Sequence, residues 1–175
     1  LAQAARKLEN QFLRQEEQRR AEEKQAEQQR LYAAHEQQLR DALTLQKNNR
    51  NNKRFHERKV EVLAELTKLR QLCCDPRLLY ENYAGHAAKL DAIAEIVESA
   101  MDAGEKTLVF SQFTSFLSLI AEVLDARGVP YFTITGATPK KRRLDLVNAF
   151  NDDDTPVFLV SLKAGGTGLN LTGAS

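Results

Sequence analysis

The sequence lacks any long apolar run. No stretch approaches the roughly 18 consecutive apolar residues that span a bilayer, and the N-terminus does not have the charged-then-apolar order of a secretory signal. We therefore expect a soluble, intracellular chain with no membrane partner, in the cytoplasm (nucleoid) of a bacterium or the nucleus of a eukaryote. The formal net charge of +1 excludes no partner, because a basic segment 1–59 offsets an acidic segment 60–175.

Cysteine and histidine are scarce and scattered. The two cysteines, Cys73 and Cys74, are adjacent, which excludes a disulfide framework, a zinc-ligand spacing and a redox Cys-x-x-Cys motif. We expect both to be small packing residues. The histidines, His35, His56 and His86, have no acidic or cysteine cluster beside them, so surface or packing roles are favoured. The sequence thus predicts no metal site and no catalytic residue.

A Walker A phosphate-binding loop is also missing. That signature requires Gly-x-x-x-x-Gly-Lys-Ser/Thr, and no glycine in this chain precedes a lysine. The segment Gly104-Glu105-Lys106-Thr107 is superficially similar, but a glutamate intervenes and the segment precedes a predicted strand. We expect no complete ATP site in the chain.

Glycine and proline are absent from residues 1–47, where Ala, Gln, Glu, Arg and Leu predominate, so one or two long helices are expected. The segment from Arg14 to Arg30 has only Ala21 and Ala26 as apolar residues, too few for a coiled-coil seam. We interpret it as a solvated helix surface, with binding to a protein partner or to DNA as the alternative. Apolar residues gather in one stripe before it and one after it: Leu1, Ala4, Ala5, Leu8 and Phe12, then Leu31, Tyr32, His35, Leu39, Ala42 and Leu43.

Helices continue to residue 104. The asparagine-rich segment 48–52 predicts a loop, helical spacing resumes at Val60 and stops at Asp75-Pro76, and a further helix is expected from about Ala88 to a glycine cap at Gly104. We expect three parts: a long polar helix or helical hairpin over residues 1–59, helices that lead into the next part over 60–105, and a part of different pattern over 106–175.

From Lys106 onward, strands alternate with helices. Three short β-branched or aromatic runs, at 107–110, 131–134 and 157–160, are separated by amphipathic stretches near 114–127 and 139–151. This order predicts an α/β fold with a mainly parallel sheet, right-handed crossovers and helices on both faces. Ligands of such sheets bind beyond the carboxyl ends of the strands. Those ends are polar or glycine-rich here: 111–113, 135–138 and 161–168.

Two segments at these ends can bind anions. In Ser161 to Thr172, SLKAGGTGLNLT, three glycines in four positions permit a nest of backbone N–H groups, although glycine clusters are often mere loops. The run Lys140 to Arg143 opens a helix, where cations oppose the helix dipole. It is either a solvated face or an attraction for phosphate.

These segments resemble the Swi/Snf-type ATPases of helicase superfamily two. Lys106 to Leu117 is similar to the fourth helicase motif, Tyr131 to Phe150 to the segment that follows it, and Val157 to Thr172 to the fifth motif. The likeness extends upstream through Ala88-Lys89-Leu90 and Leu66 to Pro76 to about Gln28. Asn170 stands where the RNA-helicase DEAD-box branch usually has aspartate. The resemblance implies the second RecA-like lobe of a motor, incomplete here, without the arginine-bearing sixth motif.

The resemblance implies that the parent protein is a DNA-stimulated ATP hydrolase that acts as a translocase or remodeller on double-stranded DNA, as in chromatin or nucleoprotein remodelling. It would use ATP and Mg2+, with a first RecA-like lobe and the backbone of double-stranded DNA as partners. Alternatives are a non-enzymatic helical adaptor with a vestigial lobe and an RNA-directed superfamily-two helicase. Gly168, Leu169 and Asn170 would lie on the nucleotide side. The residues implied along the DNA backbone are Ser111, Gln112, Gly136, Thr138, Arg143, Lys163, Ala164 and Thr167.

Overall fold

The computed structural model describes residues 2–47, 52–85, 88–166 and 168–174. It divides the chain into two compact units, Leu1–Ala87 and Ala88–Ser175. None of the helices in these ranges is both long and apolar enough to cross a membrane.

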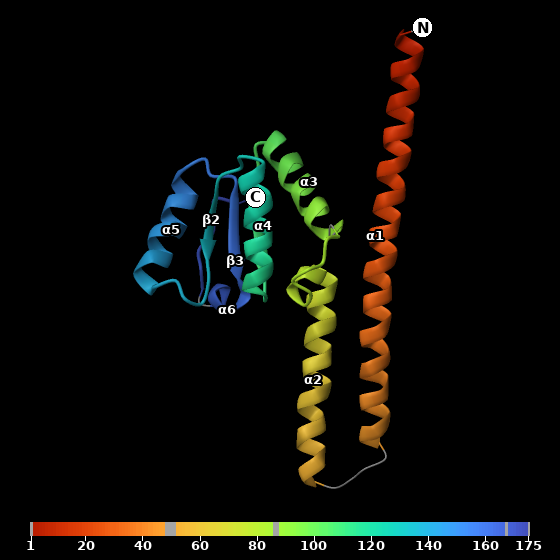
Figure 1. Ribbon diagram of the computed structural model, residues 1–175. Helices are drawn as coiled ribbons and strands as arrows, with labels where there is room; N and C mark the ends of the chain where they lie inside the picture. The colour runs from red at the N-terminus through yellow and green to blue at the C-terminus, as the bar shows by residue number, and fades with distance from the viewer. Residues whose placement is uncertain (1, 48–51, 86–87, 167, 175) are drawn as a thin grey trace. The chain divides into compact units, whose positions relative to one another are not determined.

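The first unit is a helical hairpin. Helix α1 (Ala2–Lys47) is one uninterrupted helix, and α2 (Asn52–Cys74) lies beside it (Figure 1). The predicted helices are confirmed. In the second apolar stripe, His35 is buried and Leu31 and Leu39 are half-buried, whereas Tyr32 and Leu43 are exposed. Of the predicted loop at 48–52, only Asn52 lies within the described residues. Helix α2 contributes the buried apolar side chains of the unit, Val62, Leu69 and Leu72.

A polar cluster joins the two helices inside the hairpin. The His35 imidazole Nδ1 lies 3.1 Å from Glu65 Oε2, and its Nε2 lies 2.8 Å from the Tyr80 hydroxyl. Because a carboxylate only accepts, Nδ1 donates to Glu65, and Nε2 shares the second hydrogen bond with the Tyr80 hydroxyl. Lys68 donates to the other oxygen of Glu65 at 2.6 Å. The hydrogen bond from Lys68 lowers the pKa of Glu65 below its ordinary value of 4.5, burial opposes this, and the bond from His35 adds to it.

Helix α2 ends where the sequence predicts. Asp75 is fully buried and caps the short 3-10 helix η1 (Pro76–Leu78), accepting from Arg77 N at 2.8 Å. Its other oxygen accepts from Arg77 Nη2 at 2.7 Å. Cys74 is half-buried, but Cys73 is exposed, so the prediction of a packing role is wrong for Cys73. It falls on the outer face of α2.

The second unit is built on three parallel strands: β1 (Thr107–Ser111), β2 (Tyr131–Ile134) and β3 (Val157–Ser161), in the spatial order β1-β3-β2. All five residues of β3 are buried. Leu108 pairs with Phe158 on one side, and Phe132 pairs with Phe158 on the other. The predicted α/β class with a parallel sheet is confirmed.

Helices cover both faces of this sheet (Figure 1). The connection from β1 to β2 passes β3 in one direction through α4 (Thr114–Ala126), and α5 (Lys140–Asp152) returns in the other. Right-handed crossovers therefore place α4 and α5 on opposite faces. On the α4 side, α3 (Ala88–Asp102) adds an outer layer and buries Leu90, Ala94 and Val97. On the α5 side, the core comprises Ile134, Leu146, Val147, Phe150, Phe158, Val160 and Ala164.

The segment between α3 and β1 contains the predicted glycine cap and Lys106. Gly104 has φ +74°, and the bonds Glu105 N→Ala100 O (2.8 Å) and Gly104 N→Met101 O (3.0 Å) close α3 with a Schellman cap. Lys106 does not face a ligand. Its amino group donates to Phe150 O at 2.6 Å and to Asp153 O, so it satisfies carbonyls at the C-terminus of α5.

The polar cluster of the hairpin predicts a stability that depends on pH. Because the pKa of Glu65 is lower in the folded hairpin than in the unfolded chain, the stabilisation is complete above the unfolded value, about 4.5, and is lost as pH falls through the folded value. Glu65→Gln should remove this part of the acid dependence. At neutral pH it should lower the free energy of unfolding by about 1–3 kcal/mol.

The measurement is thermal unfolding of the full chain by circular dichroism between pH 3 and pH 7. Glu61→Gln, at an exposed position one turn earlier on α2, is the matched control and should change little. Equal pH dependence in the two variants would contradict the assignment.

Candidate functional site

The carboxyl ends of the three strands form one rim. Ser111 and Ser161 are register partners at the ends of β1 and β3, and both are buried. Ser111 Oγ accepts from Phe113 N at 3.1 Å, and Ser161 Oγ accepts from Ala164 N at 3.3 Å. The two hydroxyls therefore shape the turns that leave the sheet. Gln112 lies exposed beside them.

The turn after β2 is held by its own side chains. Thr138 Oγ1 accepts from Thr135 N at 3.0 Å. Thr135 Oγ1 in turn accepts from Ala137 N at 3.3 Å, as in an ST-turn. Arg143, one turn into α5, folds back and donates through Nε to Thr138 O at 2.8 Å and through Nη2 to Gly136 O at 3.1 Å. Arg143 thus supports the turn with two of its five donors.

The segment after β3 begins as a helix rather than a loop. Helix α6 (Leu162–Gly165) follows the strand directly. Within it, Lys163 is exposed, whereas the Ala164 side chain is fully buried and its N–H is bonded to Ser161. Any part that Ala164 has in binding is therefore to shape the turn. Thr167 lies outside the described residues.

Two rim segments meet at Gly136. A Cβ added there would lie 3.7 Å from the Lys163 side chain, so the stem of Lys163 runs beside the β2 turn. Residues that are 27 positions apart in the sequence are brought together. The exposed ammonium of Lys163 and the turn at Gly136 and Thr138 therefore share one surface.

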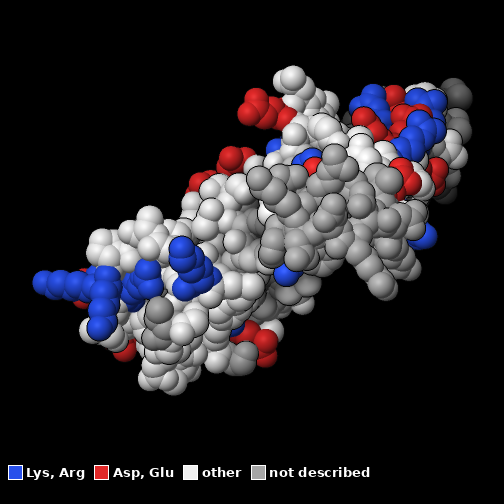
Figure 2. All heavy atoms as spheres, turned by 90° about the horizontal axis from the view of Figure 1, so that it is seen from below, with Lys and Arg blue, Asp and Glu red and all other residues white. Residues whose placement is uncertain are grey.

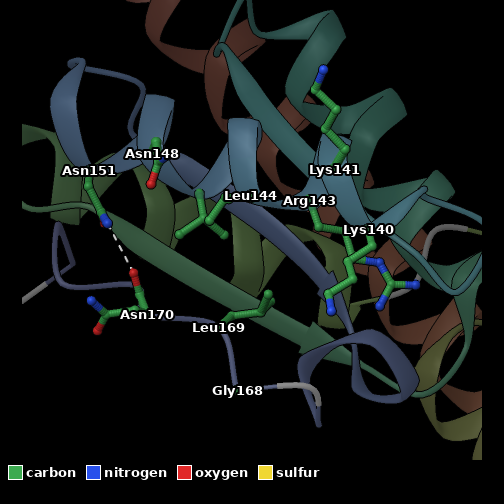
Figure 3. A pocket seen from close by; sticks show the side chains of 10 residues that line it. Lys140, Lys141, Arg143, Leu144, Asn148, Asn151, Gly168, Leu169 and Asn170 are labelled. Atoms are coloured by element: carbon green, nitrogen blue, oxygen red, sulfur yellow. Dashed lines mark hydrogen bonds between the residues drawn. The ribbon is translucent and has the colours of Figure 1, made fainter.

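An open pocket of about 940 Å³ lies between α5 and the segment 168–170. Leu144 and Leu169 point toward one another inside it, Lys140 extends toward the Gly168 side, and Lys141 extends away (Figure 3). The size falls in the range of small-ligand sites. The described residues that line it include no acidic side chain: Lys140, Lys141, Arg143, Leu144, Val147, Asn148, Asn151, Gly168, Leu169 and Asn170.

The floor of the pocket, 168–170, is fastened to α5. Gly168 has φ +71°, a conformation that favours glycine. Leu169 and Leu171 pack against the α5-side core. Asn151 donates to Asn170 O at 3.0 Å. Sequence reasoning missed Asn151; the only local signal was an asparagine, a poor helix former, in the last turn of a helix.

Basic side chains gather on the surface at this end of the sheet. Figure 2 shows basic side chains gathered together with few acidic ones among them. Lys140, Lys141 and Arg142 are exposed, the first turn of α5 has no acidic residue, and Pro139 supplies no side-chain cap. Free N–H groups and cations therefore coincide, an arrangement that suits an anion.

The comparisons with known proteins agree with this geometry. Residues 88–175 match the family described as the helicase conserved C-terminal domain. A Caenorhabditis elegans homologue of the SWI/SNF-related regulator of chromatin subfamily A containing DEAD/H box 1 is 39% identical over 114 residues, which cover 62% of this chain and 12% of the relative. The chain thus spans about an eighth of that relative's length.

Solved structures give the same likeness. The C-terminal domain of the Sulfolobus solfataricus SWI2/SNF2 ATPase has a TM-score of 0.68 and 29% identity, covering 85% of this chain and 64% of that one. The core of the same ATPase in complex with double-stranded DNA has a TM-score of 0.67 and 25% identity, covering 85% and 31%. The fold of the second unit is therefore the RecA-like fold of these domains.

The contacts of Arg143 predict an unequal response to matched substitutions. Arg143→Lys keeps the charge but loses the fork that reaches two carbonyls, so the free energy of unfolding of the second unit should fall by about 1–2 kcal/mol. Arg142→Lys, at the exposed neighbouring position, should stay within about 0.5 kcal/mol of wild type. Urea unfolding of the full chain measures both. Equal effects would show that the Arg143 fork does not hold the turn.

Proposed function

Because this chain belongs to the helicase conserved C-terminal domain family, as a lobe of the Swi/Snf type, we propose that it is the second motor lobe of a DNA-stimulated, ATP-dependent translocase acting on double-stranded DNA. The observation that carries the proposal is the rim at the carboxyl ends of the strands. There the Gly136–Thr138 turn, Lys163 and the basic start of α5 lie beside the pocket floored by 168–170.

The DNA side is proposed to be the surface shared by Gly136, Thr138 and Lys163. The exposed Lys163 ammonium and the Thr138 hydroxyl, which accepts from Thr135 N and keeps its own proton to donate, suit phosphate oxygens. Such contacts position a strand without reading its sequence. Arg143 would hold the turn, and Lys140 to Arg142 would add a longer-range attraction. Ser111, Gln112, Ala164 and Thr167 complete the proposed set. Support for duplex DNA comes from the solved Sulfolobus neighbour, whose structure is a complex with double-stranded DNA.

The nucleotide side is proposed to be Gly168, Leu169 and Asn170. Backbone groups, an exposed amide and the nearby Lys140 fit part of an anionic nucleotide such as ATP. They do not fit Mg2+, which prefers carboxylates and water. Within the described ranges, no group of three His, Cys, Asp or Glu side chains is placed to hold a metal. A first RecA-like lobe would therefore have to supply the metal ligands and the phosphate loop.

The first unit is proposed to bind a protein partner through α1. The large apolar side chains of Phe12 and Leu13 on this helix are 66% and 50% exposed, so a partner could bury them. We also propose that the chain divides into three parts at residues 59 and 105, in which the hairpin leads into the motor lobe.

The proposal implies that this chain alone does not hydrolyse ATP. The reason is that the sequence contains no Gly-Lys-Ser/Thr and that, in the part of the chain that the structure describes, no three His, Cys, Asp or Glu side chains are placed to hold a metal. Phosphate release by the purified 175-residue chain, with and without duplex DNA, should stay at the buffer background. DNA-stimulated phosphate release that co-purifies with the chain through two further columns would contradict the proposal that a first lobe supplies the phosphate loop and the metal ligands.

Lys163 should contribute to DNA affinity through counterion release. Each neutralised phosphate contributes about 0.9 to the slope of log K against log salt, so Lys163→Ala should make that slope shallower by about one unit, equally for all sequences. Fluorescence anisotropy of the full chain with duplex DNA, over a series of salt concentrations that begins at low salt, measures the slope. Lys89→Ala, an exposed lysine at the start of α3, is the control. Equal slopes in all three proteins would remove Lys163 from the DNA side, and tighter binding of single-stranded RNA would favour the RNA-directed alternative.

A further inference from the structure

Asn151 makes two hydrogen bonds to the segment that carries Gly168 to Asn170. Its Nδ2 donates to Asn170 O at 3.0 Å, and its Oδ1 accepts from Gly173 N at 2.9 Å. One side chain therefore closes the backbone turn 170–173 onto the last turn of α5. The orientation of the amide follows from these partners, because only the nitrogen can donate to a carbonyl.

The approach of the two segments depends on Gly173. A Cβ added there would lie 3.0 Å from Asn151 Cα and 3.1 Å from Phe150 O. Both are backbone atoms, which cannot turn aside as a flexible side chain can. The turn therefore rests directly on the C-terminal end of α5, within reach of the short Asn151 side chain.

The side chain at position 151 has little latitude. Aspartate would still accept from Gly173 N but would repel the carbonyl of Asn170, and alanine would lose both bonds. Glutamine is one methylene longer, which does not suit a contact at backbone distance. Asparagine thus satisfies both backbone groups where the other three side chains satisfy one or none.

The two hydrogen bonds of Asn151, to Asn170 O and from Gly173 N, form a clamp that acts on the floor of the pocket. Leu169 and Leu171 are held by the core on one face of the segment. The Asn170 side chain lies on the other face, exposed and turned away from Asn151 (Figure 3). The hydrogen bond to the Asn170 carbonyl holds the backbone at this residue. It therefore also restricts the direction in which the Asn170 side chain leaves the backbone.

We propose that Asn151 is a positioning residue, which holds the Gly168–Asn170 segment in the conformation that receives the nucleotide. It acts through the backbone groups of Asn170 and Gly173, which take both hydrogen bonds of its amide. This inference rests on the proposed function, which assigns that segment to the nucleotide side.

The first experiment measures the clamp in the full chain. Hydrogen exchange at the Gly173 amide should be at least 10-fold faster in Asn151→Ala, while exchange in β3 stays unchanged. Alanine is a better helix former than asparagine, so a weakened α5 cannot explain the loss. Asp152→Ala, at the exposed next position, is the matched control and should leave Gly173 unchanged. Unchanged exchange in Asn151→Ala would overturn the proposal.

The second experiment uses a two-lobe motor, in which this segment is completed by the arginine-bearing sixth motif and joined to a Walker A lobe. Asn151→Ala should raise KM for ATP about 10-fold and leave kcat at saturating ATP within about twofold, because a misplaced segment weakens binding rather than the chemical step. Asp152→Ala should leave both constants unchanged. An unchanged KM, with faster exchange at Gly173, would overturn the positioning role and leave the proposed function intact. A wild-type motor that does not hydrolyse ATP would overturn both.

Gly173→Ala provides an independent test of the same contact. The added methyl group should push the turn off α5 and raise KM by a similar factor. The double variant with Asn151→Ala should be no worse than either single one, since both break one clamp. Additive effects on KM would show that the two residues act separately and would overturn the clamp.

Discussion

The second unit depends on the complete burial of β3. A buried strand must satisfy every backbone N–H and C=O group inside the protein, and β3 does so by pairing with β1 on one edge and with β2 on the other. Both neighbouring strands are parallel to β3, so the segments that follow the three strands leave the sheet at the same edge. The rim that gathers the candidate binding groups is a consequence of that pairing. Its position follows from the direction of the strands.

Helix α5 connects the two proposed halves of the rim. At its N-terminal end, Arg143 binds the carbonyls of Gly136 and Thr138 on the DNA side. At its C-terminal end, Asn151 binds the segment on the nucleotide side, and Lys106 ties the last carbonyls to the start of β1. A 13-residue helix held at both ends is a stiff connection between them. Contiguous hydrogen bonds thus run from one turn through α5 to the other.

The basic residues in the first turn of α5 destabilise the N-terminal end of the helix. Cations oppose the dipole at a helix N-terminus, and neither an acidic first turn nor a side-chain cap offsets them. Arg143 escapes part of that cost by bonding to carbonyls. Lys140, Lys141 and Arg142 remain exposed with their charge directed at solvent. An arrangement that disfavours the isolated helix and favours a bound anion is consistent with a phosphate partner.

The sequence alone determined the elements and their order. Helical spacing, the proline after Asp75, the glycine at 104 and the short β-branched runs act over a few residues, so local pattern was enough to place α3, the three strands and α5. The motif likeness also indicated the family. Only the tertiary structure decided the strand order, the burial of Ala164, the fork of Arg143 and the pairing of His35 with Glu65. It also decided that Asn151 meets Asn170 and Gly173. These contacts join residues that propensity treats as independent, and they exist because packing brings distant segments within hydrogen-bond distance.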